Sequence, residues 1–251
     1  EGVSIDGLQM PTAGALSNRN MVINGGMTVA QRGTSQTITV NTVTYPCIDR
    51  WKIEVDQSSP NYTYSQDTDA PSGFKYSFKI LNNAATTQAT SGTKYNLIGQ
   101  LVEQNVVEYL GWGKSSAKPA TVSFWIKSNL TGNTVVELVI RRNGTTGLRT
   151  FAGQITINTA NTWEYKTVLV PADTGDTGAV SDNTMAFAVY FSLHGIVSSN
   201  VISTYGAWVP GNFLGGPAGA VNPFTQTVNN YINITGVQLE VGSKATPFEH
   251  E

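Results

Sequence analysis

Short apolar segments with the two-residue period of a β-strand recur along most of this chain and leave little room for long helices. From Asn20 onward they return about every 8 to 15 residues, a spacing typical of a β-sandwich. Clusters of Asn, Gly, Thr and Asp separate them and predict turns. The predicted strands are Arg50–Val55, Phe74–Leu81, Leu97–Val102, Thr121–Lys127, Thr134–Ile140, Arg149–Ile157, Trp163–Val170, Met185–Leu193, Val201–Trp208 and Tyr231–Val241. The pattern at Gln104–Leu110 fits a helical turn as well as a strand, and the sequence does not decide between them.

The composition fits a single all-β domain. Hydrophobic residues make up 40% of the 251 positions, which is enough to order the chain around a core. Charged residues make up only 13%, and the formal net charge of −2 gives no electrostatic footprint for nucleic acid or an anionic membrane. No apolar run reaches the length of about 18 residues that crosses a bilayer, so we expect no membrane insertion. Cys47 is the one cysteine, which excludes an internal disulfide and a thiolate zinc site, and we expect a buried, inert thiol.

The two ends of the predicted sandwich carry matching strand signals. Met21–Asn24 is predicted as an opening strand that ends in a Gly-Gly turn, and Tyr231–Val241 as the closing strand with a bulge at Gly236. If these strands pair, the two segments lie side by side. Residues 1–19 lack a core-forming pattern and are predicted to be an extended arm or linker, with the β-sandwich domain spanning 20–251. The chain begins at Glu1 without Met, and we expect it to be a piece of a longer or processed protein.

The sequence offers little catalytic chemistry. His194 and His250 are its two histidines, and no G-x-S-x-G elbow accompanies them. Glutamates lie in or near several strands, but nothing singles out a pair that could hydrolyse a glycoside. The loop that carries Asp173, Asp176 and Asp182 could hold calcium, although a solvated acidic turn is the favoured interpretation. We therefore predict a protein that is not an enzyme, with no catalytic residue and no metal site.

Aromatic residues are the better indication of function. Trp112, Tyr205, Trp208 and Phe213 lie in or beside glycine-rich loops, including the long loop Pro210–Asn222. Rings in such places can stack on the apolar faces of sugars, so these four are the candidate glycan-binding residues. Packing of the long loop and contacts between subunits are the alternative roles. The aromatic residues inside predicted strands are expected to fill or border the core; they are Trp51, Phe124, Trp125, Trp163, Phe187 and Phe191.

Several motifs, taken in order, resemble a bacteriophage structural module. They are Met21–Met27, Gln31–Thr34, Asp49–Trp51, Ala117–Ser128, Asn161–Glu164, Gly236–Gly242 and Ala245–His250. That module occurs in tail-fibre and other virion appendage proteins, notably of marine phages including cyanophages, and the resemblance spans about residues 8–250. The same pattern is similar to jelly-roll carbohydrate-binding modules, which implies a β-sandwich of two antiparallel sheets with a glycan-binding face. Those modules also hold a structural calcium, partly through an acidic residue soon after the opening Asn-Gly; Met27 and Thr28 occupy these positions here, so we expect no cofactor.

The resemblance implies a virion location and three functions in order of preference. The first is adsorption to the host through recognition of a surface polysaccharide, with the protein a homotrimer attached to other virion proteins. The second is a purely structural role as a decoration, adaptor or fibre-shaft protein. The third and least favoured is a tailspike-like glycan hydrolase.

Overall fold

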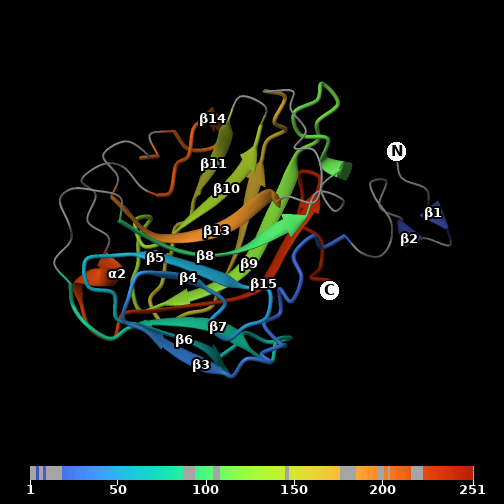
Figure 1. Ribbon diagram of the computed structural model, residues 1–251. Helices are drawn as coiled ribbons and strands as arrows, with labels where there is room; N and C mark the ends of the chain where they lie inside the picture. The colour runs from blue at the N-terminus through green and yellow to red at the C-terminus, as the bar shows by residue number, and fades with distance from the viewer. Residues whose placement is uncertain are drawn as a thin grey trace.

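The computed structural model describes residues 4–5, 8–9, 19–86, 94–103, 108–144, 147–175, 185–196, 201–202, 204–215 and 223–250. Two antiparallel sheets pack face to face as a jelly-roll β-sandwich, which confirms the predicted fold class (Figure 1). The described helices are short: η1 (Glu108–Leu110) and α2 (Pro223–Gln226). Within the described ranges, no helix has the length and apolar character needed to span a membrane.

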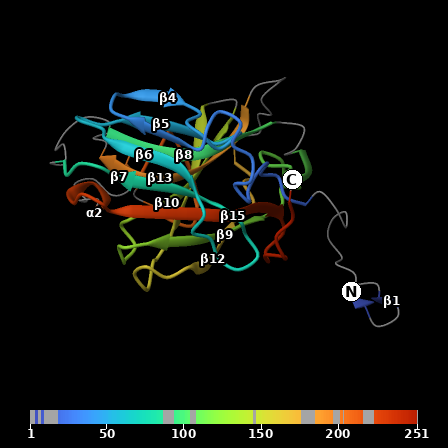
Figure 2. The same ribbon diagram turned by 90° about the horizontal axis from the view of Figure 1, so that it is seen from below.

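The larger sheet has seven strands. In spatial order they are β14 (Trp208–Pro210), β11 (Leu148–Gln154), β10 (Glu137–Asn143), β13 (Met185–Ile196), β8 (Lys94–Glu103), β5 (Lys52–Asp56) and β4 (Thr42–Thr44). The smaller sheet has six strands: β12 (Glu164–Val170), β9 (Ala120–Ser128), β15 (Tyr231–Val241), β7 (Ser77–Asn82), β6 (Tyr62–Asp67) and β3 (Ser35–Ile38). A separate two-stranded ribbon, β1 (Ser4–Ile5) with β2 (Leu8–Gln9), lies apart from both sheets (Figures 1 and 2).

Alternate residues of each strand point into the core, as the sequence period requires. Trp51 lies near its centre, with its ring stacked 6.4 Å from Phe191 and edge-on 6.5 Å from Phe78. Phe124 of the opposite sheet meets Phe191 edge-on at 4.9 Å, so aromatic contacts join the two sheets. Each such fully buried ring contributes about 2 to 3 kcal/mol of hydrophobic stabilisation.

The opening segment lies beside the closing strand as predicted, but it is not itself a strand. The Met21 amide donates to the Leu239 carbonyl (2.9 Å), and the Val237 amide donates to the Gly25 carbonyl (3.0 Å). Asn24 and Met27 have φ angles of 57° and 59°, in the left-handed region that a strand does not use. The prediction of a strand at Met21–Asn24 was therefore wrong, because these residues form a turn.

The bulge predicted at Gly236 is confirmed. The pairing of β15 with β9 shifts register between Thr235 and Gln238. Gly236 has a φ of 62°, and a Cβ placed there would lie 2.6 Å from the Phe74 ring. Both the backbone angle and the close ring favour glycine at this position.

Other differences from the sequence prediction have local causes. Val201–Trp208 is not one strand: Val201 forms an isolated bridge to Gly215, Gly206 takes a φ of 78°, and β14 begins only at Trp208. In the two main sheets, the strands β3, β4 and β6 were missed, because they carry mainly Ser, Thr, Gln and Tyr instead of aliphatic residues. The ambiguous segment before Gly111 ends in the 3-10 helix η1, while residues 104–107 lie outside the described ranges.

Candidate functional site

The four candidate aromatic residues do not form one site. Trp112 and Trp208 meet edge-on at 5.0 Å and pack against the main core, where they contact Phe187 and Phe151 respectively. The Trp208 indole N–H donates to the Pro171 carbonyl (2.8 Å). The Trp112 indole N–H likewise donates to a backbone carbonyl, at 2.8 Å. The pair closes one end of the core with both polar groups already bonded, so its geometry fits packing.

Tyr205 and Phe213 lie on the other face of the seven-stranded sheet. The Tyr205 hydroxyl donates to the Glu137 carboxylate. Burial, followed by the adjacent Glu137, raises the pKa of Tyr205 well above its usual range. Both rings pack on a second apolar cluster, which consists of Leu97, Val139, Ala152, Ala188, Tyr190, Ile202 and Leu214.

This second cluster exists because the segments before and after the edge strand β14 fold onto the outer face of the sheet. The Thr150 hydroxyl donates to the Gly211 carbonyl (2.7 Å), and the Ser192 hydroxyl donates to the Leu214 carbonyl (2.6 Å). The Gly206 amide adds a bond to the Ala152 carbonyl at 2.9 Å. The described part of the long loop therefore covers the sheet, and Tyr205 and Phe213 anchor it; residues 216–222 lie outside the described ranges.

Beside this segment lies a group of charged residues that the sequence analysis did not single out. We call Lys52, Glu54, Arg141 and Tyr190 the polar centre. The Glu54 carboxylate accepts a hydrogen bond from the Tyr190 hydroxyl (2.6 Å) and pairs with the Lys52 ammonium (2.8 Å). The Arg141 guanidinium lies 3.6 Å from the same carboxylate, and the three charged side chains are only 12–14% exposed.

The polar centre depends on a glycine. Tyr190 stands on β13 and Glu54 on β5, with Gly99 of β8 paired to Tyr190 between them. A Cβ at Gly99 would lie 2.5 Å from Cδ1 of Tyr190, so only glycine lets the ring cross β8 to reach the carboxylate. The Arg141 guanidinium covers the same ring at 4.6 Å from its centroid, a cation–π contact.

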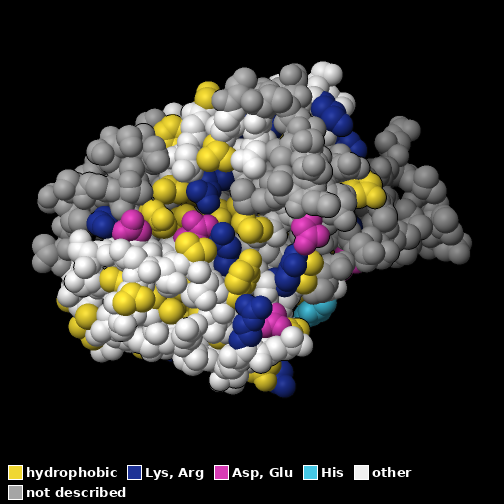
Figure 3. All heavy atoms as spheres, in the orientation of Figure 1, with side chains coloured by type: hydrophobic (Ala, Val, Ile, Leu, Met, Phe, Trp, Pro, Cys, Tyr) yellow, Lys and Arg dark blue, Asp and Glu magenta, His cyan; other side chains and the backbone are white. Residues whose placement is uncertain are grey.

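The surroundings hold Glu54 in its charged form. Burial alone would raise its pKa, but the hydrogen bonds from Lys52 and Tyr190 and the positive charges of Lys52 and Arg141 lower the pKa below the usual value. Arg141 also donates to the Asn212 side chain (3.0 Å), which joins the polar centre to the covering segment. Figure 3 shows that acidic, basic and hydrophobic side chains gather in a band on this face.

A sequence signal for this group did exist. Lys52, Glu54 and Asp56 alternate with buried Ile53 and Val55 on β5, so period-two spacing alone places three charges on one face. The partners on β10 and β13 come from strands that are distant in sequence. Whether these side chains meet depends on which strands are neighbours in the sheet, and the sequence analysis did not predict the strand order.

The acidic loop takes a different form from the expected solvated turn. Asp173 is buried, and its carboxylate accepts two hydrogen bonds from the Arg149 guanidinium, at 2.8 Å each, and a further bond from Arg142. Two arginines compete for the oxygens that calcium would need. Asp176 and Asp182 lie outside the described ranges, and the part of the chain that is described contains no cluster of three metal-ligating residues.

The in-strand aromatic residues divide into two groups. Trp51, Phe124, Phe187 and Phe191 are buried in the core, as predicted. The prediction was wrong for Trp125 and Trp163, which lie on the outer face of the six-stranded sheet. Trp125 points away from the core because it alternates with buried Phe124 and Ile126.

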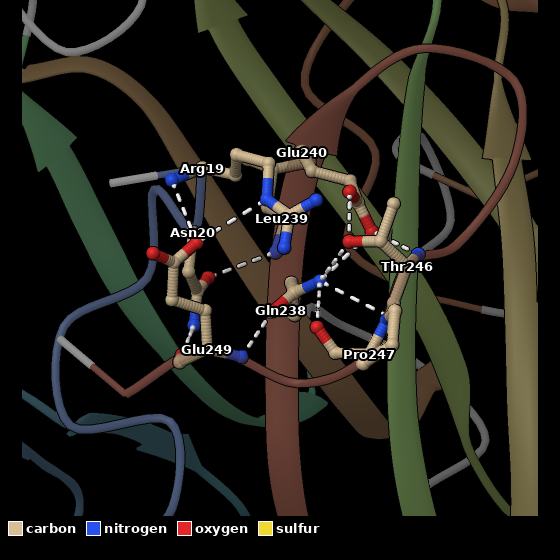
Figure 4. A network of polar contacts seen from close by, with 8 residues as sticks. All are labelled: Arg19, Asn20, Gln238, Leu239, Glu240, Thr246, Pro247 and Glu249. Atoms are coloured by element: carbon tan, nitrogen blue, oxygen red, sulfur yellow. Dashed lines mark hydrogen bonds and ion pairs between the residues drawn. The ribbon is translucent and has the colours of Figure 1, made fainter. Parts of the chain in front are cut away.

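The motifs at the two ends of the domain meet in a compact polar network (Figure 4). The Asn20 amide bonds to backbone atoms of β15 and of the C-terminal segment, and the Gln238 side chain accepts from the Glu249 amide (2.8 Å). The Thr246 hydroxyl donates to the Glu240 carboxylate at 2.7 Å. These polar groups satisfy one another, so the network is a structural lock between the chain ends.

Comparison with known proteins gives likeness of fold only. No family model matches the chain, and no curated protein matches it. Among solved structures it is similar to the enzymatically active domain of tailspike protein 4 from bacteriophage CBA120, with 13% identity and a TM-score of 0.43 over 89% of this chain. The chain spans only 21% of that tailspike chain.

Two carbohydrate-binding modules show similar values. TmCBM61, solved with β-1,4-galactotriose, is 9% identical with a TM-score of 0.38, and the match covers 90% of this chain and 100% of the module. The C-terminal family 22 module of Clostridium thermocellum Xyn10B is 9% identical with a TM-score of 0.43, over 79% of this chain and 90% of the module. At such identities no residue role can be transferred to this chain.

Proposed function

We propose that this protein binds a cell-surface polysaccharide without covalent chemistry, through the polar centre on the outer face of the seven-stranded sheet. The observation that carries the proposal is the arrangement of Lys52, Glu54 and Arg141 around Tyr190, beside the second apolar cluster on the same face. Three charged side chains on the outer face of a sheet do not contribute to the packing of the hydrophobic core. They suit a partner rich in hydroxyl groups.

The chemistry of the group matches that of a sugar. A hydroxyl both donates and accepts, so Glu54 can accept from it while Lys52 and Arg141 donate to it. Mutual ion pairs already hold these side chains in place, which lowers the conformational entropy lost on binding. Tyr95, on β8 next to Asp56 of β5, adds a partly exposed ring at the edge of the group.

The carboxyl groups argue against hydrolysis. A glycosidase needs one carboxylic acid whose pKa is raised, so that it can protonate the leaving group. The carboxyl groups of Glu54, Asp67, Asp69 and Glu164 do not meet this need, because the pKa of each is lowered. A hydrolase would shorten the polysaccharide on incubation. With this protein we expect the length distribution of the polysaccharide to stay unchanged.

The biological setting rests on the sequence resemblance. We propose that the protein belongs to a bacteriophage tail fibre or other virion appendage, where it contributes to host adsorption as a homotrimer. Three copies would combine weak sites into one strong attachment through effective concentration. Analytical ultracentrifugation checks the copy number, and labelling of whole virions with a specific antibody checks the location.

A purely structural role is the second candidate. It is favoured by the candidate aromatic residues, since Trp112, Tyr205, Trp208 and Phe213 all pack within their own chain. It predicts that neither host cells nor their polysaccharides bind the purified protein.

The test compares two variants with the same change of charge. Lys52→Met removes one donor of the polar centre, while Lys114→Met removes an exposed lysine elsewhere. On arrays of bacterial surface polysaccharides and on whole host cells, we expect Lys52→Met to weaken binding at least 10-fold and Lys114→Met to leave it unchanged. Equal binding by both variants, or no binding by the unaltered protein, would contradict the proposal. Circular dichroism and the melting temperature verify that each variant is folded.

A further inference from the structure

The outer face of the six-stranded sheet carries an aromatic surface, whereas the polar centre lies on the seven-stranded sheet. Trp125 of β9 is paired in register with Tyr165 of β12, and their rings lie 5.4 Å apart at an angle of 51°. Trp163 immediately precedes β12, two positions from Tyr165 and therefore on the same side of the strand. We call Trp125, Trp163 and Tyr165 the aromatic patch; β9 and β12 form one edge of the sheet (Figure 2).

The rings of the aromatic patch lie outside the core, unlike those of the other tryptophans. The Tyr165 residue is 45% exposed, and Trp125 and Trp163 are half-buried. Trp51 is buried, and Trp112 and Trp208 pack against the core. The two outward tryptophans therefore stand out among the five of the chain. Aromatic residues gathered at one exposed place mark an interaction site more often than single exposed residues do.

Polar groups border the aromatic patch. Asp69, in the connection between β6 and β7, accepts a hydrogen bond from the Trp163 indole N–H (3.0 Å) and another from the Lys127 ammonium (2.7 Å). Its side chain remains 43% exposed, which leaves carboxylate surface open to a ligand. Asn161 lies two residues before Trp163, and its side-chain oxygen accepts a hydrogen bond from the Tyr231 hydroxyl (2.7 Å).

The charges of this border cancel. Lys127 neutralises Asp69, so the border offers no excess charge to a phosphate or a cation. A ligand that matches it is neutral, has a flat apolar face for the rings, and carries hydroxyls for the carboxylate and amide. A pyranose unit has all three properties, because its C–H faces are apolar and its rim is hydroxylated.

We propose that the aromatic patch, with Asp69 at its border, is a second carbohydrate-binding site that takes a neutral pyranose unit of a polysaccharide. The sugar stacks on Tyr165 and Trp125, and its hydroxyls donate to Asp69. The two sites use different residues on the outer faces of opposite sheets, so each can fail without the other. Together they let one protein molecule hold two strands of polysaccharide, or one strand that passes around it.

The experiment uses affinity electrophoresis of the whole chain in gels that contain xylan, β-1,4-galactan, hydroxyethylcellulose or lipid-free bacterial O-polysaccharide. Tyr165→Ala and Trp125→Ala are compared with Tyr109→Ala, which removes a tyrosine that is 73% exposed on η1. We expect the dissociation constant to rise at least 10-fold for the first two variants and to stay unchanged for the third. Tyr165→Leu keeps apolar bulk without an aromatic ring and is expected to lose binding while folding normally.

Fluorescence gives an independent measurement. Bound polysaccharide should protect Trp125 and Trp163 from quenching by acrylamide, and this protection should vanish when both are replaced by Phe. Unchanged affinity in Tyr165→Ala together with loss in Lys52→Met overturns this inference and leaves the proposed function intact. Loss of affinity in Tyr165→Ala together with unchanged affinity in Lys52→Met supports binding at the aromatic patch and contradicts binding at the polar centre. Binding of none of these polysaccharides by the unaltered protein, or capture of a peptide strand along β12 in their place, also overturns the inference.

Discussion

The amide of Leu239 donates a hydrogen bond to the side-chain oxygen of Asn20 across 219 residues of sequence, at 3.1 Å. The same oxygen accepts from the Val22 amide (3.0 Å), and the Asn20 nitrogen donates to the carbonyls of Val237 (3.2 Å) and Glu249 (3.1 Å). One side chain thus satisfies four backbone groups from the opening turn, β15 and the C-terminal segment. No other residue type of this size offers two donors and two acceptor sites in one plane.

Replacement of Asn20 should therefore destabilise the protein strongly. Asn20→Ala leaves the Leu239 and Val22 amides without their acceptor, at a cost of about 2 to 3 kcal/mol in the free energy of unfolding. Asn20→Asp keeps the acceptor but sets a carboxylate against two carbonyl oxygens, and should also destabilise. Urea denaturation measures both effects, and Asn133→Ala, at an exposed turn, is the control. A loss no larger than that of the control would show that the bonds of Asn20 are dispensable.

Trp208 is predicted to matter for stability and not for binding. Trp208→Ala removes ring contacts with Trp112 and Phe151 and the hydrogen bond to Pro171, which we expect to cost about 2 to 3 kcal/mol. Below the lowered melting temperature, polysaccharide affinity should equal that of the unaltered protein. A variant that keeps its melting temperature but loses affinity would return Trp208 to the candidate binding residues.

Cys47 should react only when the protein unfolds. The residue is 1% exposed, and burial raises the pKa of its thiol to about 11. At pH 8 a thiol with such a pKa is about one-thousandth thiolate, and the thiolate is the nucleophile. We expect a disulfide reagent to label no cysteine in native protein and one cysteine per chain in urea. Rapid labelling of the native protein would contradict the buried position.

Glu54 should contribute to acid sensitivity. Because its pKa is lowered by folding, the charged carboxylate stabilises the protein above the unfolded pKa, and this contribution disappears as the pH falls through the folded value. Glu54→Gln should therefore be less stable than the unaltered protein near pH 7, with the difference shrinking below about pH 4.5. Urea titrations across this range provide the measurement. Glu103→Gln, at a side chain that is 63% exposed, is the matched control for the substitution.

The elements predicted correctly from sequence are those with aliphatic or aromatic alternation. Tyr231–Val241 has its predicted bounds, and its bulge is at the predicted glycine. β3 and β6 were missed because their inward positions are filled by Tyr, Gln and Ile between polar residues, a pattern that resembles a loop. Turn segments with left-handed residues, such as Asn24, were mistaken for strands because their apolar residues reach the core without regular pairing.

The candidate sites were harder to predict than the fold. Glycine-rich surroundings suggested that Tyr205 and Phe213 were exposed, but the segment that carries them folds back onto its own sheet. Outward placement of Trp125 could have been predicted from its alternation with Phe124 and Ile126. The meeting of Glu54 with Tyr190 could not, because it depends on which strands are neighbours and on the missing side chain of Gly99.

The ion pair of Arg19 with Glu249, 3.4 Å between Nε and Oε2, has a mechanical consequence. Tension applied to the domain through these two positions would not stretch the sandwich from end to end. It would pull directly on the few hydrogen bonds that join the opening turn, β15 and the C-terminal segment around Asn20. In a domain joined in this way, the hydrogen bonds between the chain ends bear the applied force before the hydrophobic core does.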